Sequence, residues 1–315
     1  MAFDPRPYLK ELARGEHGAR SLDREQARAL FAAVFAGEVA DVALGALLVA
    51  LRIKGETPAE LAGMLDALAP HVQPLRLPSR RAMPVLVPTY NGARKLPNLV
   101  PLLALSLARE GVPVLLHGAA QEAQRVDTFA ILSLLGHAPV ASMAEAEARL
   151  DERLLAPLPL AVLSPALARL VDVRLAIGVR NSGHTLAKLL LPREVPSTAA
   201  CRLISVTHPD FMKRLRDMFA GTPANVFLMR GVEGEPVVRL HSPQPVEQVG
   251  VDGSVVTHLM ADGEQDLHLP AREAPATAEW TRDVLEARAP RPSALARQVS
   301  LIVEHCRAAG AAARP

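Results

Sequence analysis

The sequence predicts an α/β protein in which a small all-helical N-terminal domain packs on a larger α/β domain with a mostly parallel central sheet. Residues 21–68 place apolar side chains at helical spacing, a proline-rich linker follows, and short apolar strands then alternate with helices. Because 315 residues exceed what one core usually fills, we expect two domains. We assign residues 1–78, joined by helices from about 165 to 192, to the helical domain and residues 79–315 to the α/β domain.

The first part of the chain predicts three helices, each with apolar residues at helical spacing. The expected ranges are 22–37, 42–53 and 58–68. Ser21 is placed to cap the first helix, and Asp41 opens the second. Gly55 suits a left-handed C-cap for the second helix. Thr57 and Pro58 supply an N-cap and a first-turn proline for the third.

The rest of the chain alternates strands with helices, which is typical of parallel βαβ units. The expected strands are 85–87, 112–116, 160–163, 202–206, 225–229 and 254–259. The expected helices are 99–108, 126–135, 186–191, 209–219 and 292–308. Ligands of such sheets bind outside the carboxyl ends of the strands. We therefore expect a site among the loops that follow Val87, Leu116, Leu163, Val206 and Met229.

The composition, with 50% hydrophobic and 22% charged residues, excludes a disordered or collagen-like chain. No run of 18 residues is free of charge, proline and polar breaks, so we expect no membrane span. The N-terminus has no basic segment leading into an apolar one, and Cys201 and Cys306 lie far apart with no metal-ligand spacing. These observations predict a cytoplasmic protein with reduced thiols.

The net charge of +2 conceals a split along the chain. Residues 232–270 carry a balance of −6, and residues 169–231 carry a balance of +6. Residues 79–95 carry four cations and no acid: Arg80, Arg81, Arg94 and Lys95. Such asymmetry can mark a surface that binds a polyanion, although the two signs can also interleave in the fold. Because aromatic residues amount to only 3%, nucleic-acid binding would depend on phosphate contacts rather than on base stacking.

The loop 89–95 is the most informative local feature. It follows a buried strand and precedes a helix, where backbone N–H groups can bind a phosphate. Gly92 permits close backbone approach, but a phosphate cradle usually contains several glycines. Arg94 and Lys95 supply charge instead, which favours an extended polyanion over an enclosed pyrophosphate. The alternative is an Asn91-Gly92 turn with two solvated cations.

The segment 178–188 is a second candidate site. With Asn181 or Ser182 as N-cap, His184 and Lys188 share one face of the following helix. Arg180 precedes that helix, so the segment can form an anion site or, alternatively, a solvated amphipathic face. His117 follows another strand and can serve as an acid or base, but a hydrogen-bonded structural role is more common.

The sequence carries few signs of catalysis. It contains no dinucleotide-binding or Walker glycine loop, no zinc-protease motif and no nucleophile elbow. Glu233 and Glu235 lie in a Gly/Pro loop after a strand and can form a metal site, but they are more often surface charges. Lys213, Arg214 and Arg216 are best interpreted as a solvated helix face.

The run 37–57 resembles the N-terminal helical domain of the anthranilate phosphoribosyltransferases, which belong to glycosyltransferase family 3 and have the class II nucleoside phosphorylase fold. The segments 88–95, 98–103, 113–118 and 178–188 resemble the YbiB-type proteins of the same fold. The first resemblance implies a homodimer formed through the small domain. The second implies nucleic-acid binding, DNA in particular, without the enzyme activity.

The sequence departs from the enzymes at their phosphate-binding residues. The Gly-rich phosphoribosyl-pyrophosphate loop is replaced, and Tyr90 and Arg94 would fill the space that glycines leave for pyrophosphate. The enzymes have a Lys-His-Gly-Asn loop, and this sequence has Leu116 in place of the Lys and Ala119 in place of the Asn. The Asp-Glu pair that holds Mg²⁺ is reduced to the region of Glu233 and Glu235. These losses remove the neutralisation of charge on which pyrophosphate displacement depends.

Three matches to the enzymes remain, at His117-Gly118, at Asn98 and at Arg180, the last matching the Arg that binds the substrate carboxylate. We predict a non-sequence-specific DNA-binding homodimer that uses no cofactor or metal and has no catalytic residues. One alternative is a phosphoribosyltransferase that uses Mg²⁺, phosphoribosyl pyrophosphate and an aromatic or nucleobase-like acceptor. Another is a small-molecule sensor whose cleft retains an anionic ligand. The predicted binding residues, which are expected to line a cleft between the domains or lie beside it, are Arg80, Arg81, Asn91, Gly92, Arg94, Lys95, Asn98, His117, Arg180, His184 and Lys188.

Overall fold

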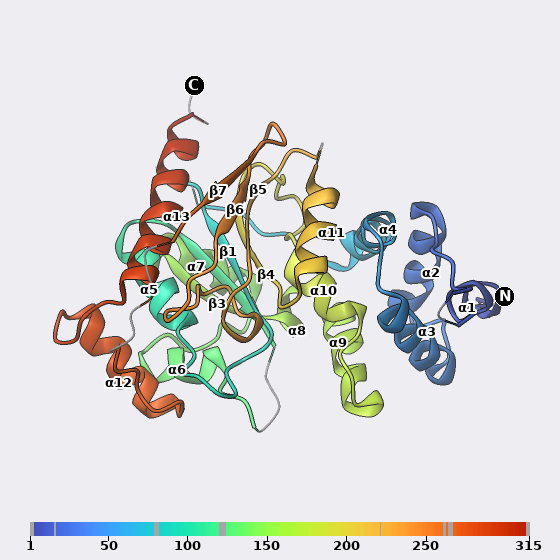
Figure 1. The fold of residues 1–315 in the computed structure, drawn as a ribbon, viewed down its shortest axis with the longest axis horizontal. Helices are drawn as coiled ribbons and strands as arrows, with labels where there is room; N and C mark the ends of the chain where they lie inside the picture. Colours follow the sequence, from blue (N-terminus) through green and yellow to red (C-terminus); the bar gives the residue numbers. More distant parts are fainter. Residues whose placement is uncertain are drawn as a thin grey trace. The chain divides into compact units, whose positions relative to one another are not determined.

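The computed structural model describes residues 3–15, 17–78, 82–119, 124–220, 222–260, 263 and 267–312. The predicted site residues Arg80 and Arg81 lie outside the described residues. The chain forms two units, Met1–Pro74 with Leu160–Arg193 and Leu75–Pro159 with Glu194–Pro315 (Figure 1). The first unit is helical and the second is α/β with a mostly parallel sheet, which confirms the predicted fold class.

The first unit contains only helices in the part of it that the structure describes. They are α1 (Arg6–Leu12), α2 (Arg24–Ala36), α3 (Asp41–Lys54), α4 (Pro58–Leu68), the 3-10 turn η1 (Ala69–His71), α8 (Leu160–Leu163), α9 (Pro165–Ile177) and α10 (Ser182–Leu189). The predicted cap at Ser21 is wrong, because Asp23 accepts a hydrogen bond from the N–H of Gln26 (2.8 Å) and completes a capping box there. Thr57 caps α4 as predicted. Gly55 ends α3 with φ 78° and ψ 134°, so the C-cap is not left-handed helical.

The second unit is built on one seven-stranded sheet with the order β3-β2-β1-β4-β5-β6-β7. The strands are β1 (Val85–Thr89), β2 (Val114–Gly118), β3 (Leu155–Pro159), β4 (Cys201–Ser205), β5 (Asn225–Met229), β6 (Val246–Val249) and β7 (Val255–His258). The first five pair in parallel, while β6 and β7 are antiparallel.

The predicted strand 160–163 is wrong, because those residues form helix α8 and the strand lies just before them as β3. Pro157 and Pro159 interrupt β3, which conceals it in the sequence, and an edge strand tolerates them. Strand β6, helix α1 and two further helices, α7 (Met143–Arg153) and α12 (Ala274–Leu285), also had no counterpart among the predicted elements.

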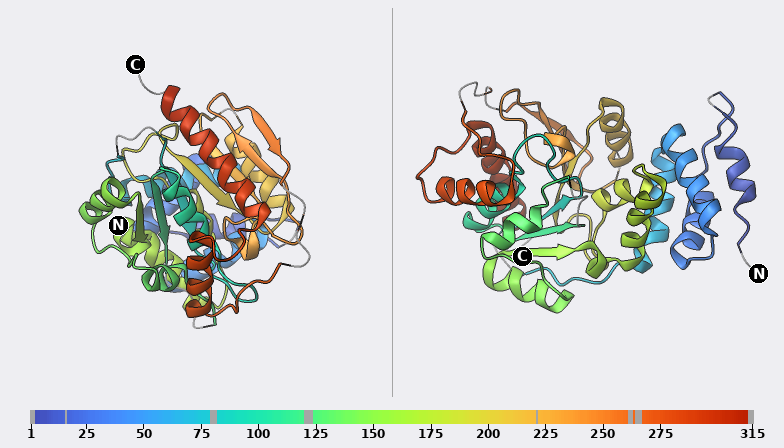
Figure 2. Two further views of the ribbon diagram at one scale, coloured as in Figure 1. Left: turned by 90° about the vertical axis from the view of Figure 1, so that its left-hand side faces the viewer. Right: turned by 90° about the horizontal axis from the view of Figure 1, so that it is seen from below.

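Helices cover the sheet. They are α5 (Val100–Arg109), α6 (Thr128–Leu134), α7 (Met143–Arg153), α11 (Pro209–Phe219), α12 (Ala274–Leu285) and α13 (Ser293–Ala312), with the 3-10 turn η2 (Val232–Gly234) after β5. One sheet face packs on α5, α12 and α13, where Val87, Leu116 and Leu203 meet Leu103 and Ile302 in the core. In the left view of Figure 2, α13 (red) lies in front of the strands. None of the described helices could span a bilayer.

The strand register gathers several loops at one edge of the sheet. Thr89 pairs with Gly118, and Ser205 pairs with Met229, so the loops after β1, β2, β4 and β5 leave the sheet on the same side. The chain runs outward from β1 to β3 and then returns to place β4 on the other side of β1. That reversal is the position at which open α/β sheets bind ligands. The candidate site is therefore centred on the loop after β1.

Candidate anion-binding site

The loop after β1 forms a cradle of backbone N–H groups, and two carboxylates of the same chain fill it. Oε1 of Glu235 accepts hydrogen bonds from the N–H groups of Asn91 (2.6 Å) and Gly92 (2.8 Å). The two carboxylate oxygens of Glu233 accept from the N–H groups of Arg94 (2.5 Å) and Lys95 (3.0 Å). Four N–H groups that could bind phosphate oxygens thus bind carboxylates of the same chain. Like phosphate, a carboxylate is an anion that accepts hydrogen bonds from such N–H groups.

The segment that delivers these carboxylates fits closely against the loop. Glu233 lies in the left-handed region (φ 52°, ψ 22°), which is uncommon for a non-glycine residue. Gly234 has φ +85°, and a Cβ there would lie 2.2 Å from Nδ2 of Asn91. Position 234 requires glycine, because any other residue would adopt this positive φ and bring its Cβ against Asn91. This role of Glu233 and Glu235 was not predicted from the sequence, although both residues follow a strand that ends at the same sheet edge.

The side chains of Arg94 and Lys95 take no part in these hydrogen bonds, which come from the backbone. Both residues are exposed, and no ion pair joins either side chain to a carboxylate among the residues that the structure describes. Arg272 donates to the carbonyl of Arg94 (2.6 Å), and Arg125 donates to the carbonyl of Asn91 (3.1 Å). The loop therefore presents exposed cationic side chains outside a cradle whose N–H groups are already bonded.

His117 and Tyr90 form a buried pair beneath this loop. The Tyr90 hydroxyl and Nδ1 of His117 are 2.7 Å apart, and both residues are almost fully buried. Burial lowers the pKa of His117 to about 3, and burial together with the Glu235 charge raises the pKa of Tyr90. His117 is therefore neutral near pH 7 and adds no positive charge to the site.

Asn98 is likewise buried, and its side chain fixes the approach to α5. Its Nδ2 donates to Oγ1 of Thr128 (2.8 Å) and to the carbonyl of Val126 (3.2 Å), while its Oδ1 accepts from the N–H of Val100 (3.2 Å). Thr128 also lies 2.6 Å from the hydroxyl of Thr89 at the end of β1. These bonds hold the end of β1 against the starts of α5 and α6.

The second predicted set lies in the other unit: Arg180 precedes α10, His184 lies in its first turn and Lys188 in its last. Asn181 caps this helix by accepting from the N–H of Gly183 (2.9 Å), as the sequence predicts. Burial and the nearby Arg180 lower the pKa of His184 to about 3, so this side chain is also neutral near pH 7. Because the two sets belong to different units, their meeting in one cleft stays a prediction.

The two buried histidines predict a pH dependence of stability. Their pKa values of about 3 in the folded state lie below the unfolded value of about 6.5, so between those pH values the unfolded chain binds protons that the folded chain does not. The free energy of unfolding is therefore complete above pH 6.5 and falls by about 1.4 kcal/mol per pH unit for each histidine below it.

Urea denaturation at pH 7.5 and pH 5.0 measures this effect, for which we expect a loss of about 2 kcal/mol per histidine. His117→Gln should remove the contribution of His117, while His208→Gln, at an exposed position, should leave the pH dependence unchanged. Equal pH dependence in wild type and His117→Gln would contradict the assignment for His117.

The charge split of the sequence is partly an interleaving of signs. Arg216 on α11 bonds Glu247 on β6, with Nε and Oε2 at 2.9 Å, which joins the basic stretch to the acidic one. Lys213 pairs with Asp217 one turn along α11 (2.9 Å), and Arg214 lies over the ring of Phe211. The interpretation of this run as a solvated helix face therefore holds for the exposed Lys213 but not for Arg216, which bonds a strand of the sheet.

The Mg²⁺ that the enzyme resemblance implies would need free carboxylate oxygens at the sheet edge. The residues present do not fit that role, because Glu233 accepts N–H groups with both oxygens and Oε1 of Glu235 accepts two. Over the described ranges, no group of three or more His, Cys, Asp or Glu side chains is arranged to hold a metal ion.

Comparison with known proteins identifies relatives for most of the chain. The helical bundle domain of the glycosyl transferase family matches residues 6–71. The protein YbiB of Escherichia coli K12 is 38% identical over 95% of this chain and 93% of its own length. Anthranilate phosphoribosyltransferase of Thermus thermophilus is 31% identical over 69% of this chain, an alignment that spans 64% of the enzyme.

The fold comparison agrees over nearly the full length. The crystal structure of the Thermus thermophilus enzyme matches with a TM-score of 0.73 and 25% identity, covering 96% of this chain and 95% of the enzyme. The Saccharomyces cerevisiae enzyme in complex with phosphoribosyl pyrophosphate and Mg has the same fold, with a TM-score of 0.72 and 12% identity over 98% of this chain and 89% of the enzyme. The chain therefore belongs to glycosyl transferase family 3, as a relative of YbiB and of the anthranilate phosphoribosyltransferases.

Proposed function

We propose that this protein binds nucleic acid through its phosphate groups, without strong sequence preference, and does not catalyse the anthranilate phosphoribosyltransferase reaction. One observation carries the proposal. The N–H groups of the β1 loop are occupied by Glu233 and Glu235, while the side chains of Arg94 and Lys95 on the same loop remain exposed.

The two ligand types need different parts of this loop. A small pyrophosphate is held by close contact with backbone N–H groups and with a metal ion. Glu233 and Glu235 already bond those N–H groups, and the same bonds use oxygens that would hold the metal ion. An extended polyanion needs only exposed cationic side chains, which contact successive phosphates along a strand. Arg94 and Lys95 supply such contacts at a sheet edge. Arg180 and Lys188 belong to the same proposal, and we place the protein in the cytoplasm.

Titration of single-stranded DNA, duplex DNA and RNA at about 50 and 200 mM salt tests the binding proposal. We expect affinity to fall steeply as salt rises, because counterions released from phosphates drive such binding. An affinity that does not depend on salt would overturn it. For the second half, calorimetry with phosphoribosyl pyrophosphate should show no saturable binding, whereas Mg²⁺-dependent product formation from anthranilate would contradict it.

We also propose that the protein is a homodimer joined through its helical unit. Helix α3 carries an exposed apolar stripe, Val42, Ala46, Val49 and Ile53, spaced four, three and four residues apart. Val42 is 89% exposed and Ile53 79% exposed. An uncharged stripe of this kind on one helix suits a symmetric contact with its own copy.

Ile53→Glu is expected to weaken dimerisation by more than about tenfold, because the interface would bury an unpaired carboxylate. Light scattering during size-exclusion chromatography measures the mass. Val256→Glu, which changes a half-exposed apolar residue of β7 in the other unit, is the matched control and should leave the mass unchanged. A wild-type monomer at all concentrations, or equal loss in both variants, would contradict the proposal.

A further inference from the structure

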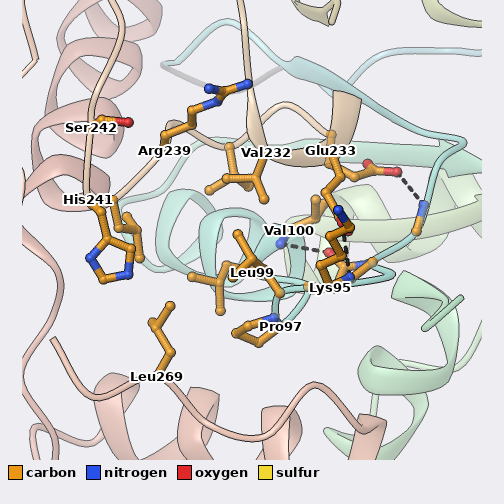
Figure 3. A pocket seen from close by; sticks show the side chains of 17 residues that line it. Lys95, Pro97, Leu99, Val100, Val232, Glu233, Arg239, His241, Ser242 and Leu269 are labelled. Atoms are coloured by element: carbon orange, nitrogen blue, oxygen red, sulfur yellow. Dashed lines mark hydrogen bonds between the residues drawn. The ribbon is translucent and has the colours of Figure 1, made fainter.

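A pocket of about 400 Å³ lies in the α/β unit between the segment after the β1 loop and the segment that follows η2 (Figure 3). Its volume falls in the range of about 300–1,000 Å³ that small-molecule sites occupy. Its lining residues all belong to the α/β unit, and Arg180, His184 and Lys188 are not among them. Three residues of the predicted binding set, Gly92, Lys95 and Asn98, line it.

The walls of this pocket are mostly aliphatic. Leu99, Val100, Val237 and Leu240 are buried at its floor, and Leu269 closes one side. No aromatic ring of Phe, Tyr or Trp lines it among the described residues, so it offers little stacking surface to a flat ligand. Asn98 also lines the pocket, but its side chain forms hydrogen bonds with Val126, Thr128 and Val100. The interior therefore favours a hydrocarbon body over a polar ring.

The rim of the pocket is cationic. Arg239 and Lys95 both line the pocket, and both residues are exposed. Neither side chain pairs with a carboxylate among the described parts of the chain. Glu233 also lines the pocket, but both its oxygens accept N–H groups of Arg94 and Lys95, which offset its charge. An anionic group at the rim would thus meet two cations that no described carboxylate neutralises.

We propose that this pocket binds a small aliphatic carboxylate, with the hydrocarbon chain on Leu99, Val100 and Leu240 and the carboxylate between Arg239 and Lys95. The apolar floor supplies burial of the chain, at about 25 cal/mol per Å² removed from water, and the two cations select an acid over a neutral alcohol. Lys95 is also one of the proposed nucleic-acid contacts. The bound carboxylate therefore lowers nucleic-acid affinity, a consequence that rests on the proposed function.

The direct test uses decanoate and does not depend on nucleic acid. We expect decanoate to bind the full chain in calorimetry with one site per chain, and decanol to bind at least about tenfold more weakly, since a charge-assisted hydrogen bond is lost. Arg239→Gln should weaken decanoate to a similar extent, and Val232→Trp, which fills the half-buried wall, should abolish binding. Arg297→Gln removes an exposed cation of α13 outside the pocket and should change nothing.

Two results would overturn the inference: equal affinity for decanoate and decanol, or unchanged decanoate affinity in both Arg239→Gln and Val232→Trp when each retains the wild-type circular dichroism spectrum. Decanoate binding without any nucleic-acid binding would leave the pocket assigned and refute only the proposed function. If both bind, decanoate should lower nucleic-acid affinity in wild type but not in Val232→Trp.

Discussion

Reversing both charges of the β1 loop, in Arg94→Glu/Lys95→Glu, is expected to lower nucleic-acid affinity about 100-fold at low salt, equivalent to about 2.8 kcal/mol of binding free energy. The variant removes two phosphate contacts and places two negative charges beside the polyanion. The slope of log affinity against log salt should also become shallower by about 2, since about one phosphate contact is lost with each cation.

This variant leaves the cradle itself intact, because the N–H groups that bind Glu233 belong to the backbone. The matched control is Arg291→Glu/Arg297→Glu, which makes the same change in net charge. Both positions are exposed, the first just before α13 and the second within it. Fluorescence anisotropy with a labelled oligonucleotide measures both. A similar loss in both variants would mean that only the overall charge matters, and the loop would lose its proposed role.

Much of the fold was predictable because local patterns and tertiary structure agree. The strands at 85–87 and 225–229 are short, continuous, buried apolar runs in the centre of the sheet, and their length and flanking turn residues identify them. The edge strand β3 was not predicted because prolines are incompatible with a central strand, and the sequence does not show that β3 lies at the edge. Asp23 displaced Ser21 as the helix cap because its reciprocal partner, Gln26, stands three residues on.

The candidate site was predictable in its location but not in its state. The β1 loop, its position at a strand end and its exposed Arg94 and Lys95 follow from residue types and from the rules of parallel sheets. That Glu235 bonds Asn91 does not follow, because these residues lie 144 positions apart and meet only through the register of the sheet. Neutral His117 was equally hidden, since its pKa depends on burial that the sequence does not specify.

Under the proposed function, the internal carboxylates explain how one scaffold serves nucleic-acid binding in place of phosphoribosyl transfer. A family of folds keeps its strand-end loops while the chemistry of those loops changes. Here the anion preference of the backbone N–H groups is retained, but the anion is covalently part of the chain. The loop is thereby held without a ligand, which keeps Arg94 and Lys95 at fixed backbone positions. Removing the internal anion should then restore the demand for an external one.

Glu233→Ala/Glu235→Ala is therefore expected to lose stability that an external oxyanion can restore. The variant leaves four N–H groups of the β1 loop without acceptors, of which those of Asn91 and Gly92 belong to buried residues. We expect the free energy of unfolding to fall by about 2–4 kcal/mol, since each unsatisfied buried donor costs about 1–3 kcal/mol. Pyrophosphate at about 100 times its dissociation constant should then stabilise the variant by about 2.7 kcal/mol.

Urea denaturation with and without pyrophosphate, at ionic strength matched with sodium chloride, measures the gain. Wild type should show no gain, because its N–H groups are already bonded to carboxylates. Glu279→Ala/Glu304→Ala removes two exposed carboxylates elsewhere in the same unit and should also show none, which separates the cradle from a change in net charge. If the variant loses stability but pyrophosphate restores nothing, the carboxylates serve packing alone and the loop is not an anion site. If pyrophosphate stabilises Glu233→Ala/Glu235→Ala alone, the β1 loop retains an oxyanion cradle. In the wild-type chain, Glu233 and Glu235 occupy that cradle.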